Sequence, residues 1–285
     1  MGQLWIVATP VGNLGDITYR AVEILRQVQG IAAEDTRHSR VLLAHYGIET
    51  PLFAVHAHNE QEAALRVIGA LQAGESWALI SDAGTPLISD PGARLVRACI
   101  EQGITVTPIP GPCAAIAALS VSGLCAESFV FEGFLPAKGA MRRRALEKVQ
   151  KLPHTIILYE SVHRILDLLA QLAELLTPSR QIVVARELTK RFESVLRGTA
   201  VEVLAQYVAS PDTVRGEFVV LIEGAPETAL LEGGSLEQAL VDKLLPELLQ
   251  HLPLKAAVSL LTKATGLKKN SLYEQAVKLQ QQVSA

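Results

Sequence analysis

Short apolar runs recur through the first 225 residues of the chain, and most of them pass into a polar loop and then into a stretch with helical spacing. A short apolar run bounded by turn residues is typical of a buried strand, and apolar positions three and four apart are typical of a helix. In the N-terminal half the runs occupy residues 4–8, 30–33, 52–55, 77–80 and 105–109. Because these strands alternate with helical patterns, they predict an α/β domain with a parallel sheet over residues 1–123.

A second set of apolar runs follows, at residues 129–135, 155–158, 181–185, 194–198 and 218–222. The short, hairpin-like spacing between Glu187 and Gly198 indicates some antiparallel pairing, which predicts a mixed sheet in a second α/β domain over residues 124–225. Residues 225–235 are rich in Pro, Glu and Gly and are typical of a linker. Helical patterns around a Thr265-Gly266 turn then predict a small helical C-terminal module over residues 236–285.

The loop ISDAGTPLISDPG, residues 80–92, follows one of the predicted strands and precedes a helical pattern. In an open parallel sheet, ligands bind beyond the carboxyl ends of the strands. Here Gly84 lets the backbone approach a ligand closely, while Asp82 offers a carboxylate and Thr85 a hydroxyl. We therefore expect this loop to form the centre of a binding site.

Parts of these strand ends also allow a purely structural interpretation. Ser89 or Asp90 could be the N-cap of the following helix, with Pro91 as its first residue. The adjacent carboxylates of residues 34–35 lie close to two arginines in EDTRHSR and could form a solvated helix start, although their position at a strand end keeps a functional role open.

Two further loops follow predicted strands. Residues 9–16, TPVGNLGD, contain glycines that allow a sharp turn, but they do not match the dinucleotide-binding G-x-G-x-x-G pattern. Pro110-Gly111-Pro112 opens into a run of small residues that predicts a tightly packed helix, with its N-terminal amides directed at the same crevice.

Composition excludes several classes of protein. The chain has 285 residues, of which 49% are hydrophobic, and a formal net charge of -3, so it has no global signature of nucleic-acid binding. No apolar run approaches the roughly 20 residues of a membrane span, and the N-terminus lacks the basic region of a signal peptide, so we expect a cytoplasmic protein. Three scattered cysteines argue against a disulfide framework or a zinc site. His56 and His58 lie near Glu60 without a convincing third ligand, so no metal is expected.

Basic residues are concentrated in two windows. Residues 138–151 contain Lys138, Arg142, Arg143, Arg144, Lys148 and Lys151 with Glu147 as the single acid, and the C-terminal module contains lysines 255, 263, 268, 269 and 278. The first window could be a solvated helix face or could line a polyanion. The helix-turn-helix pattern of the module could contact nucleic acid or could be a small structural cap.

Eight motifs together carry a family resemblance. In order they are ATPVGNLGD, EDTRHSRVLL, SDAGTPLISDPG, IPGPCAAIAALSVSG, FEGFLP, YESVHR, ARELTK and GEFVVLIEG. The chain resembles the tetrapyrrole methylase superfamily, and within it the family of ribosomal RNA small subunit methyltransferases I, which methylate the ribose 2′-oxygen of a cytidine in 16S rRNA. The resemblance is dense over residues 4–224 and looser in the tail.

This resemblance implies two α/β domains with S-adenosylmethionine in the cleft between them, within a homodimer that acts on 16S rRNA or the small ribosomal subunit. Family members that act on porphyrin-like rings often have a glycine-rich first loop where this chain has Thr9-Pro10-Val11-Gly12, which argues against a tetrapyrrole substrate. The cofactor-binding residues implied by the resemblance are Val11, Asp82, Gly84, Thr85, Pro112, Cys113, Tyr159, Ala185 and Glu217.

Methyl transfer from a sulfonium to a ribose hydroxyl needs alignment and is helped by a base. Candidate bases at the expected cleft are Glu34, Asp35, Glu187 and Lys190, and our hypothesis assigns the role to Lys190 or Glu187, which could instead bind phosphate or pair with each other. The residues expected to contact RNA are Arg142, Arg143, Arg144, Lys268 and Lys269. Two other functions stay open: methylation of a corrin- or porphyrin-like small molecule, and RNA binding without catalysis.

Overall fold

The computed structural model describes residues 2–56, 59–226 and 236–283 of the chain. Contacts along the chain divide it into two compact units, Met1–Gly224 and Ala225–Ala285, and each is described separately. His58, which was considered as a metal ligand, lies outside the described residues, and so do residues 227–235 of the predicted linker.

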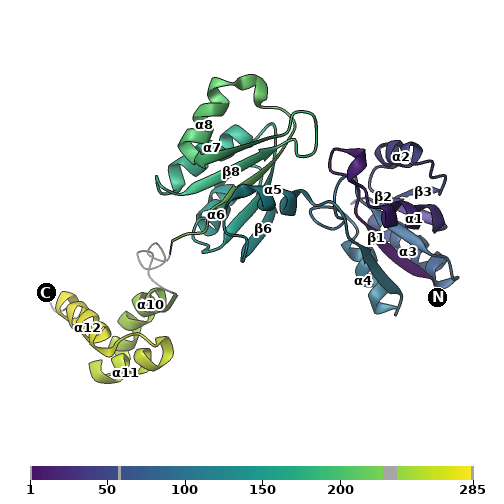
Figure 1. The fold of residues 1–285 in the computed structure, drawn as a ribbon. Coiled ribbons are helices and arrows are strands. Elements are labelled where there is room, and N and C mark those ends of the chain that lie inside the picture. Colours follow the sequence, from purple (N-terminus) through teal and green to yellow (C-terminus); the bar gives the residue numbers. More distant parts are fainter. Residues whose placement is uncertain (1, 57–58, 227–235, 284–285) are drawn as a thin grey trace. The chain divides into compact units, whose positions relative to one another are not determined.

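The first unit begins with a five-stranded sheet in which every neighbouring pair of strands is parallel, as predicted. The strand order is β3-β2-β4-β1-β5, so β1 lies between β4 and β5. Figure 1 labels β1, β2 and β3 of this sheet. The strands are β1 (Gln3–Val7), β2 (Gly30–Ala33), β3 (Leu52–Ala54), β4 (Trp77–Ile80) and β5 (Thr105–Ile109).

Helices cover both faces of this sheet because its strands are apolar on both sides. Leu4 and Ile6 pack with α3 and α4 on one face, while Val7 and Ile31 pack with α1 and α2 on the other. The helices are α1 (Tyr19–Gln27), α2 (Thr36–His45), α3 (Glu60–Gln72) and α4 (Ala93–Glu101), and a short 3-10 turn, η1 (Leu14–Asp16), lies in the first loop.

A second five-stranded sheet has the order β6-β7-β10-β8-β9. Strands β6 and β7 are parallel, and the other neighbouring pairs are antiparallel, so the predicted mixed sheet and its hairpin are confirmed. The strands are β6 (Phe129–Phe134), β7 (Thr155–Ser161), β8 (Gln181–Arg186), β9 (Ser194–Thr199) and β10 (Glu217–Ile222). Strand β7 runs three residues beyond its predicted end at residue 158, which brings Tyr159 and Glu160 into the sheet.

Alternate residues of β7 pack on opposite faces of this sheet. Ile156 and Leu158 belong to a core with α6, α7 and α8, whereas Ile157 belongs to a core with α5. Helix α5 therefore packs on the second sheet although the predicted domain boundary at residue 123 follows it. These helices are α5 (Ala114–Ser122), α6 (Gly139–Val149), α7 (Ile165–Leu175) and α8 (Ala200–Ala209), with the 3-10 turn η2 (Pro211–Thr213) after them.

Helix α8 was not predicted, although the sequence contains its start signal. The Thr199 hydroxyl accepts a hydrogen bond from the backbone N–H of Glu202, and the Glu202 carboxylate accepts one from the backbone N–H of Thr199. This reciprocal capping box is a recognisable Thr-x-x-Glu pattern.

The described residues of the second unit form three helices, α10 (Leu236–His251), α11 (Leu254–Thr265) and α12 (Lys269–Val283). Val241, Leu245, Val258, Leu261 and Leu272 form its core. Gly266 ends α11 in a left-handed conformation with φ +72°, which gives the predicted helix, turn and helix. Across the described part of the chain, the structure contains no helix with the length and apolar character needed to cross a lipid bilayer.

Candidate active site

Three loops of the first sheet meet because the strands that precede them, β4, β1 and β5, are neighbours and run in the same direction. Thr9, after β1, and Gly84, after β4, exchange two backbone hydrogen bonds of 2.9 and 3.0 Å. The Thr85 hydroxyl donates a 3.0 Å hydrogen bond to the carbonyl of Pro112, after β5. The three predicted loops therefore form one connected surface at the carboxyl edge of the sheet.

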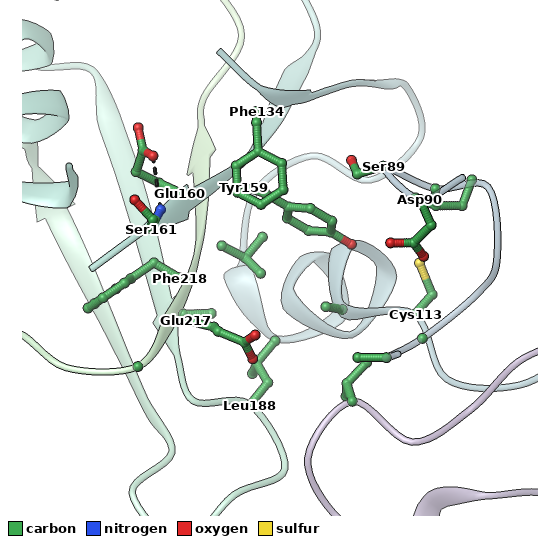
Figure 2. Close-up of a pocket in the computed structure, with 18 of the residues that line it drawn as sticks. Ser89, Asp90, Cys113, Phe134, Tyr159, Glu160, Ser161, Leu188, Glu217 and Phe218 are labelled. Atoms are coloured by element: carbon green, nitrogen blue, oxygen red, sulfur yellow. Dashed lines mark hydrogen bonds between the residues drawn. The ribbon is translucent and has the colours of Figure 1, made fainter. Parts of the chain in front are cut away.

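A cavity of about 400 Å³, the central cavity, lies against this surface and against strands β7, β8 and β10 of the second sheet (Figure 2). Its volume is in the range of small-molecule sites, about 300–1,000 Å³. Of the nine residues predicted to bind a cofactor, seven line it: Val11, Gly84, Thr85, Cys113, Tyr159, Ala185 and Glu217. The structure thus brings together residues from both halves of the first unit.

The central cavity also has walls that the sequence did not reveal. Ile88, Phe134, Leu188 and Val219 add apolar surface, and Asp90 adds a carboxyl group. The apolar residues carry no distinctive sequence signal, since core residues have the same composition. Their contribution depends on which strand ends the second sheet brings to the cavity.

A second cavity of about 550 Å³, the adjoining cavity, shares Val11, Ala83 and Glu217 with the central one. Asp82 and Lys190 line it, together with residues of the first loop and of α2. Asp82 is therefore at the predicted edge of the sheet, but it faces this adjoining space. Pro112 lines neither of these two cavities, and its contribution is the carbonyl that holds Thr85.

The acidic residues after β2 resolve one of the open alternatives. Asp35 is the N-cap of α2: its side chain accepts a 2.8 Å hydrogen bond from the backbone N–H of Arg37 and pairs with the Arg37 guanidinium at 2.7 Å. These hydrogen bonds hold the pKa of Asp35 well below its usual range. Asp35 is thus a poor base. Its role is structural, as the start of α2. Its backbone N–H donates a 3.0 Å hydrogen bond to Asp82.

Tyr159 connects the second sheet to the start of α5. Its hydroxyl oxygen accepts a 3.1 Å hydrogen bond from the backbone N–H of Ala115. Burial, followed by the neighbouring Cys113 and Asp90 groups, raises the pKa of Tyr159 well above its usual range. The hydroxyl therefore keeps its proton at neutral pH. One of the helix amides expected to face the crevice is occupied by this contact.

Lys190 and Glu187, the predicted catalytic pair, form an ion-pair cluster with Glu217. The Lys190 ammonium lies 2.9 Å from Glu187 and 2.8 Å from Glu217. Burial opposes the charge, but the hydrogen bonds that the ammonium donates to both carboxylates outweigh this effect and raise the pKa of Lys190. Burial likewise opposes the ionised form of Glu187, yet its bonds to Lys190 and to the Glu217 backbone lower its pKa. A protonated lysine and a weakly basic carboxylate are poorly suited to accept a proton.

The proposed cap role of Ser89 and Asp90 is wrong. Helix α4 begins at Ala93, and its N-cap is Gly92, at φ +119°. The Glu60 carboxylate, from α3, accepts hydrogen bonds of 3.1 Å from the backbone N–H groups of Gly92 and Arg94. A carboxylate from a neighbouring helix therefore caps α4 in place of Asp90, which lines the central cavity.

One residue that was predicted to contact RNA is buried. Arg142 is 2% exposed, and its guanidinium donates a 2.9 Å hydrogen bond to buried Glu160, so it cannot reach a phosphate in this structure. It lies on the buried face of α6, and the run of basic residues in the sequence does not indicate which of them is buried. Arg143 and Arg144 on the same helix are exposed, and Lys268 and Lys269 are exposed on the second unit.

Two family models match the chain. The first, the tetrapyrrole (corrin/porphyrin) methylases, matches residues 3–204. The second, described as the RsmI C-terminal HTH domain, matches residues 235–280 and thus the helical module.

Curated relatives are similar over almost the whole chain. One from Escherichia coli O157:H7, named ribosomal RNA small subunit methyltransferase I, is 50% identical and covers 98% of this chain and 96% of its own length. A protein of the same name from Pseudomonas aeruginosa is 52% identical, with 98% of each chain covered.

Solved structures with a similar fold are much more distant in sequence. Cobalt precorrin-4 methyltransferase, a cobalamin biosynthetic enzyme, has a TM-score of 0.58 at 15% identity and covers 78% of this chain and 94% of its own. Uroporphyrin-III C-methyl transferase from Thermus thermophilus, complexed with S-adenyl homocysteine, has a TM-score of 0.55 at 18% identity. It covers 78% of this chain and 97% of its own. These similarities concern the fold.

Proposed function

The chain belongs to the tetrapyrrole (corrin/porphyrin) methylase family, and from that premise we propose that it transfers the methyl group of S-adenosylmethionine to the 2′-hydroxyl of a cytidine in 16S rRNA. The observation that carries this proposal is the near-complete similarity to proteins named ribosomal RNA small subunit methyltransferase I, at about 50% identity. The similarity includes the C-terminal module, which a fold shared only with small-molecule methylases does not explain.

The central cavity fits a methyl donor of this kind. Its lining is mainly apolar and suits the donor's nucleoside and thioether portions, with Val11, Ala185 and Leu188 among the wall residues. Thr85 can hydrogen-bond polar atoms, and the carboxyl group of Glu217 favours a ligand with positive charge. When bound, the donor supplies an electrophilic methyl carbon.

The acceptor would approach through the adjoining cavity, which shares three wall residues with the central one. The exposed basic residues Arg143, Arg144, Lys268 and Lys269 suit the phosphates of an RNA. Phosphate contacts of this kind would position the RNA without reading its sequence. A base buried in a helix would have to leave its stack to reach such a site.

The experiment is transfer of a labelled methyl group from S-adenosylmethionine by the purified full-length protein to three acceptors: small ribosomal subunits, naked 16S rRNA and a corrinoid precursor. We expect label in one or both RNA acceptors, at a cytidine ribose that resists alkaline cleavage. Label in the corrinoid alone would support the small-molecule alternative, and RNA binding without transfer would support the non-catalytic one. Light scattering on the same sample tests the expected homodimer.

A further inference from the structure

Asp90 lines the central cavity, and one of its two carboxylate oxygens has no hydrogen-bond partner among the described residues. It lies in the loop between β4 and α4, and its Oδ2 atom is buried and makes no hydrogen bond to the described residues. Figure 2 shows the carboxyl group beside the Cys113 sulfur, on the side of the cavity toward which the Tyr159 hydroxyl points. A buried carboxylate oxygen with no partner is costly to the fold and calls for a functional explanation.

The roles that commonly retain a buried aspartate are taken by other residues. Glu60 caps α4 in its place. No lysine or arginine of the described residues forms an ion pair with Asp90, and the nearest carboxylates, Asp82 and Glu34, repel its charge. The loop that carries it also holds Leu87 and Ser89 at positive φ, 76° and 73°, which side chains other than glycine rarely adopt.

The surroundings of Asp90 give it the properties of a base. Burial, together with the charge of Asp82, raises its pKa to about 6, although the Ser81 hydroxyl acts in the opposite direction. Such a carboxyl group is largely ionised near neutral pH and is still basic enough to take a proton. Of the other candidates, Lys190 is held in its protonated form and Glu187 accepts hydrogen bonds from two donors. The pKa of Asp35 is lowered. The pKa of Glu34 is raised as well, but Glu34 lines neither of the two cavities described.

We propose that Asp90 is the proton acceptor for the hydroxyl group that is methylated in the central cavity. The inference rests on the proposed function. The acceptor oxygen forms a bond to the methyl carbon, the carbon–sulfur bond of the donor breaks, and its electron pair stays on sulfur, which becomes a neutral thioether. The hydroxyl proton passes to Asp90, which becomes a neutral carboxylic acid and releases the proton to solvent after the product leaves. The Tyr159 hydroxyl and the Cys113 thiol are the neighbouring groups that face this carboxyl.

The test compares Asp90→Asn with wild type and with Asp212→Asn, a matched control whose side chain is 99% exposed. Single-turnover methyl transfer is measured at saturating S-adenosylmethionine, on whichever acceptor the wild type methylates, from pH 5 to pH 9. Calorimetry measures binding of S-adenosylhomocysteine to each protein. We expect Asp90→Asn to slow transfer by about 100- to 10,000-fold, to bind the ligand within about threefold of wild type, and to lose the rise of rate with pH that wild type shows.

Two results would overturn the proposal while leaving the proposed function intact. One is a transfer rate for Asp90→Asn within about threefold of wild type. The other is a loss of rate matched by an equal loss of ligand affinity, which would make Asp90 a donor-binding group. A wild type that methylates none of the acceptors would overturn the proposed function and this inference with it. Normal transfer by wild type with slow, pH-independent transfer by Asp90→Asn would support both.

Discussion

The hydroxyl oxygen of Tyr159 lies 3.1 Å from the backbone nitrogen of Ala115 and accepts its hydrogen bond. This contact joins strand β7 to the first turn of α5, at the wall of the central cavity. Because the first turn of a helix has amides without intrahelical partners, an acceptor from another element satisfies one of them. The Tyr159 side chain therefore lines the cavity and also satisfies a backbone amide at the start of α5.

Replacement of Tyr159 by Phe should lower the free energy of unfolding by about 1–3 kcal/mol, because the Ala115 N–H loses its acceptor in a partly buried position. The ring contacts with Phe131 and Phe134 would remain, since Phe keeps the ring. Urea denaturation measures the change. Tyr19→Phe, at a residue that is 94% exposed, is the control and should match wild type. Equal stability of the two variants would mean that the Tyr159 contact contributes little.

The buried ion pair of Arg142 and Glu160 gives a prediction on stability. Both side chains are nearly inaccessible, and Glu160 also accepts a 2.7 Å hydrogen bond from Arg164. Arg142→Met should destabilise the protein by about 3–5 kcal/mol, since it leaves part of a buried carboxylate without its partner. Arg144→Met, at an exposed position of the same helix, should stay within about 0.5 kcal/mol of wild type in the same denaturation experiment. A small effect of Arg142→Met would show that Arg164 alone is enough to stabilise the Glu160 carboxylate.

The Glu187 carboxylate is packed directly over Gly216, which has φ +85°, and a Cβ atom there would lie 2.2 Å from the carboxylate. Gly216→Ala should displace Glu187, disturb its ion pair with Lys190 and weaken binding of S-adenosylhomocysteine, which calorimetry measures. Gly103→Ala is the matched control, because Gly103 has φ +70° but no atom within 4 Å of an added Cβ. Both variants should lose about 1 kcal/mol of stability from backbone strain, while the binding defect should belong to Gly216→Ala. Equal binding by the two variants would contradict a role for the Glu187 position.

Asp90 predicts a dependence of stability on pH. Its pKa in the folded protein is about 6, above the value of about 3.9 in an unfolded chain. At low pH the carboxyl group is protonated in both states and costs nothing, but as the pH rises through this interval the unfolded state releases the proton first, so stability is lost. Asp90→Asn should therefore unfold at a higher temperature than wild type at pH 8 and at a similar temperature near pH 3.5, measured without ligand. The unfolding temperature of Asp212→Asn should stay close to that of wild type at both pH values. If the difference between Asp90→Asn and wild type were the same at pH 8 and pH 3.5, the raised pKa of Asp90 would be contradicted.

The exposed lysines at the start of α12 give a prediction on RNA affinity. Replacing Lys268 and Lys269 together by Gln should weaken binding of 16S rRNA uniformly and reduce the slope of log affinity against log salt by up to about 1–2. Lys243→Gln, an exposed lysine of α10 in the same module, is the control. An unchanged slope for the double variant would mean that this turn does not contact phosphate and that the module is structural.

The sequence by itself determined the identity of most elements. Short apolar runs followed by polar segments located all five strands of the parallel sheet, because burial on both faces leaves a distinctive pattern. Gly84 and Thr85 were expected at a binding site because their loop follows a parallel strand, whereas Val11 and Cys113 were implied by the family resemblance; all four line the central cavity. Helix α8 was missed, although its capping box was present in the sequence.

Only the tertiary structure decided which polar groups are available for chemistry. Arg142 and Arg144 are two residues apart in one basic run, yet one is buried against Glu160 and the other is exposed, because a helix turns successive residues to different faces. Lys190 became an ion-pair partner because β10 brings Glu217 to it from 27 residues away. Asp90 does not cap α4, because Glu60, 30 residues earlier in the sequence, caps this helix in its place. Charge and hydrogen-bonding partners depend on contacts between distant segments, and local sequence patterns do not contain them.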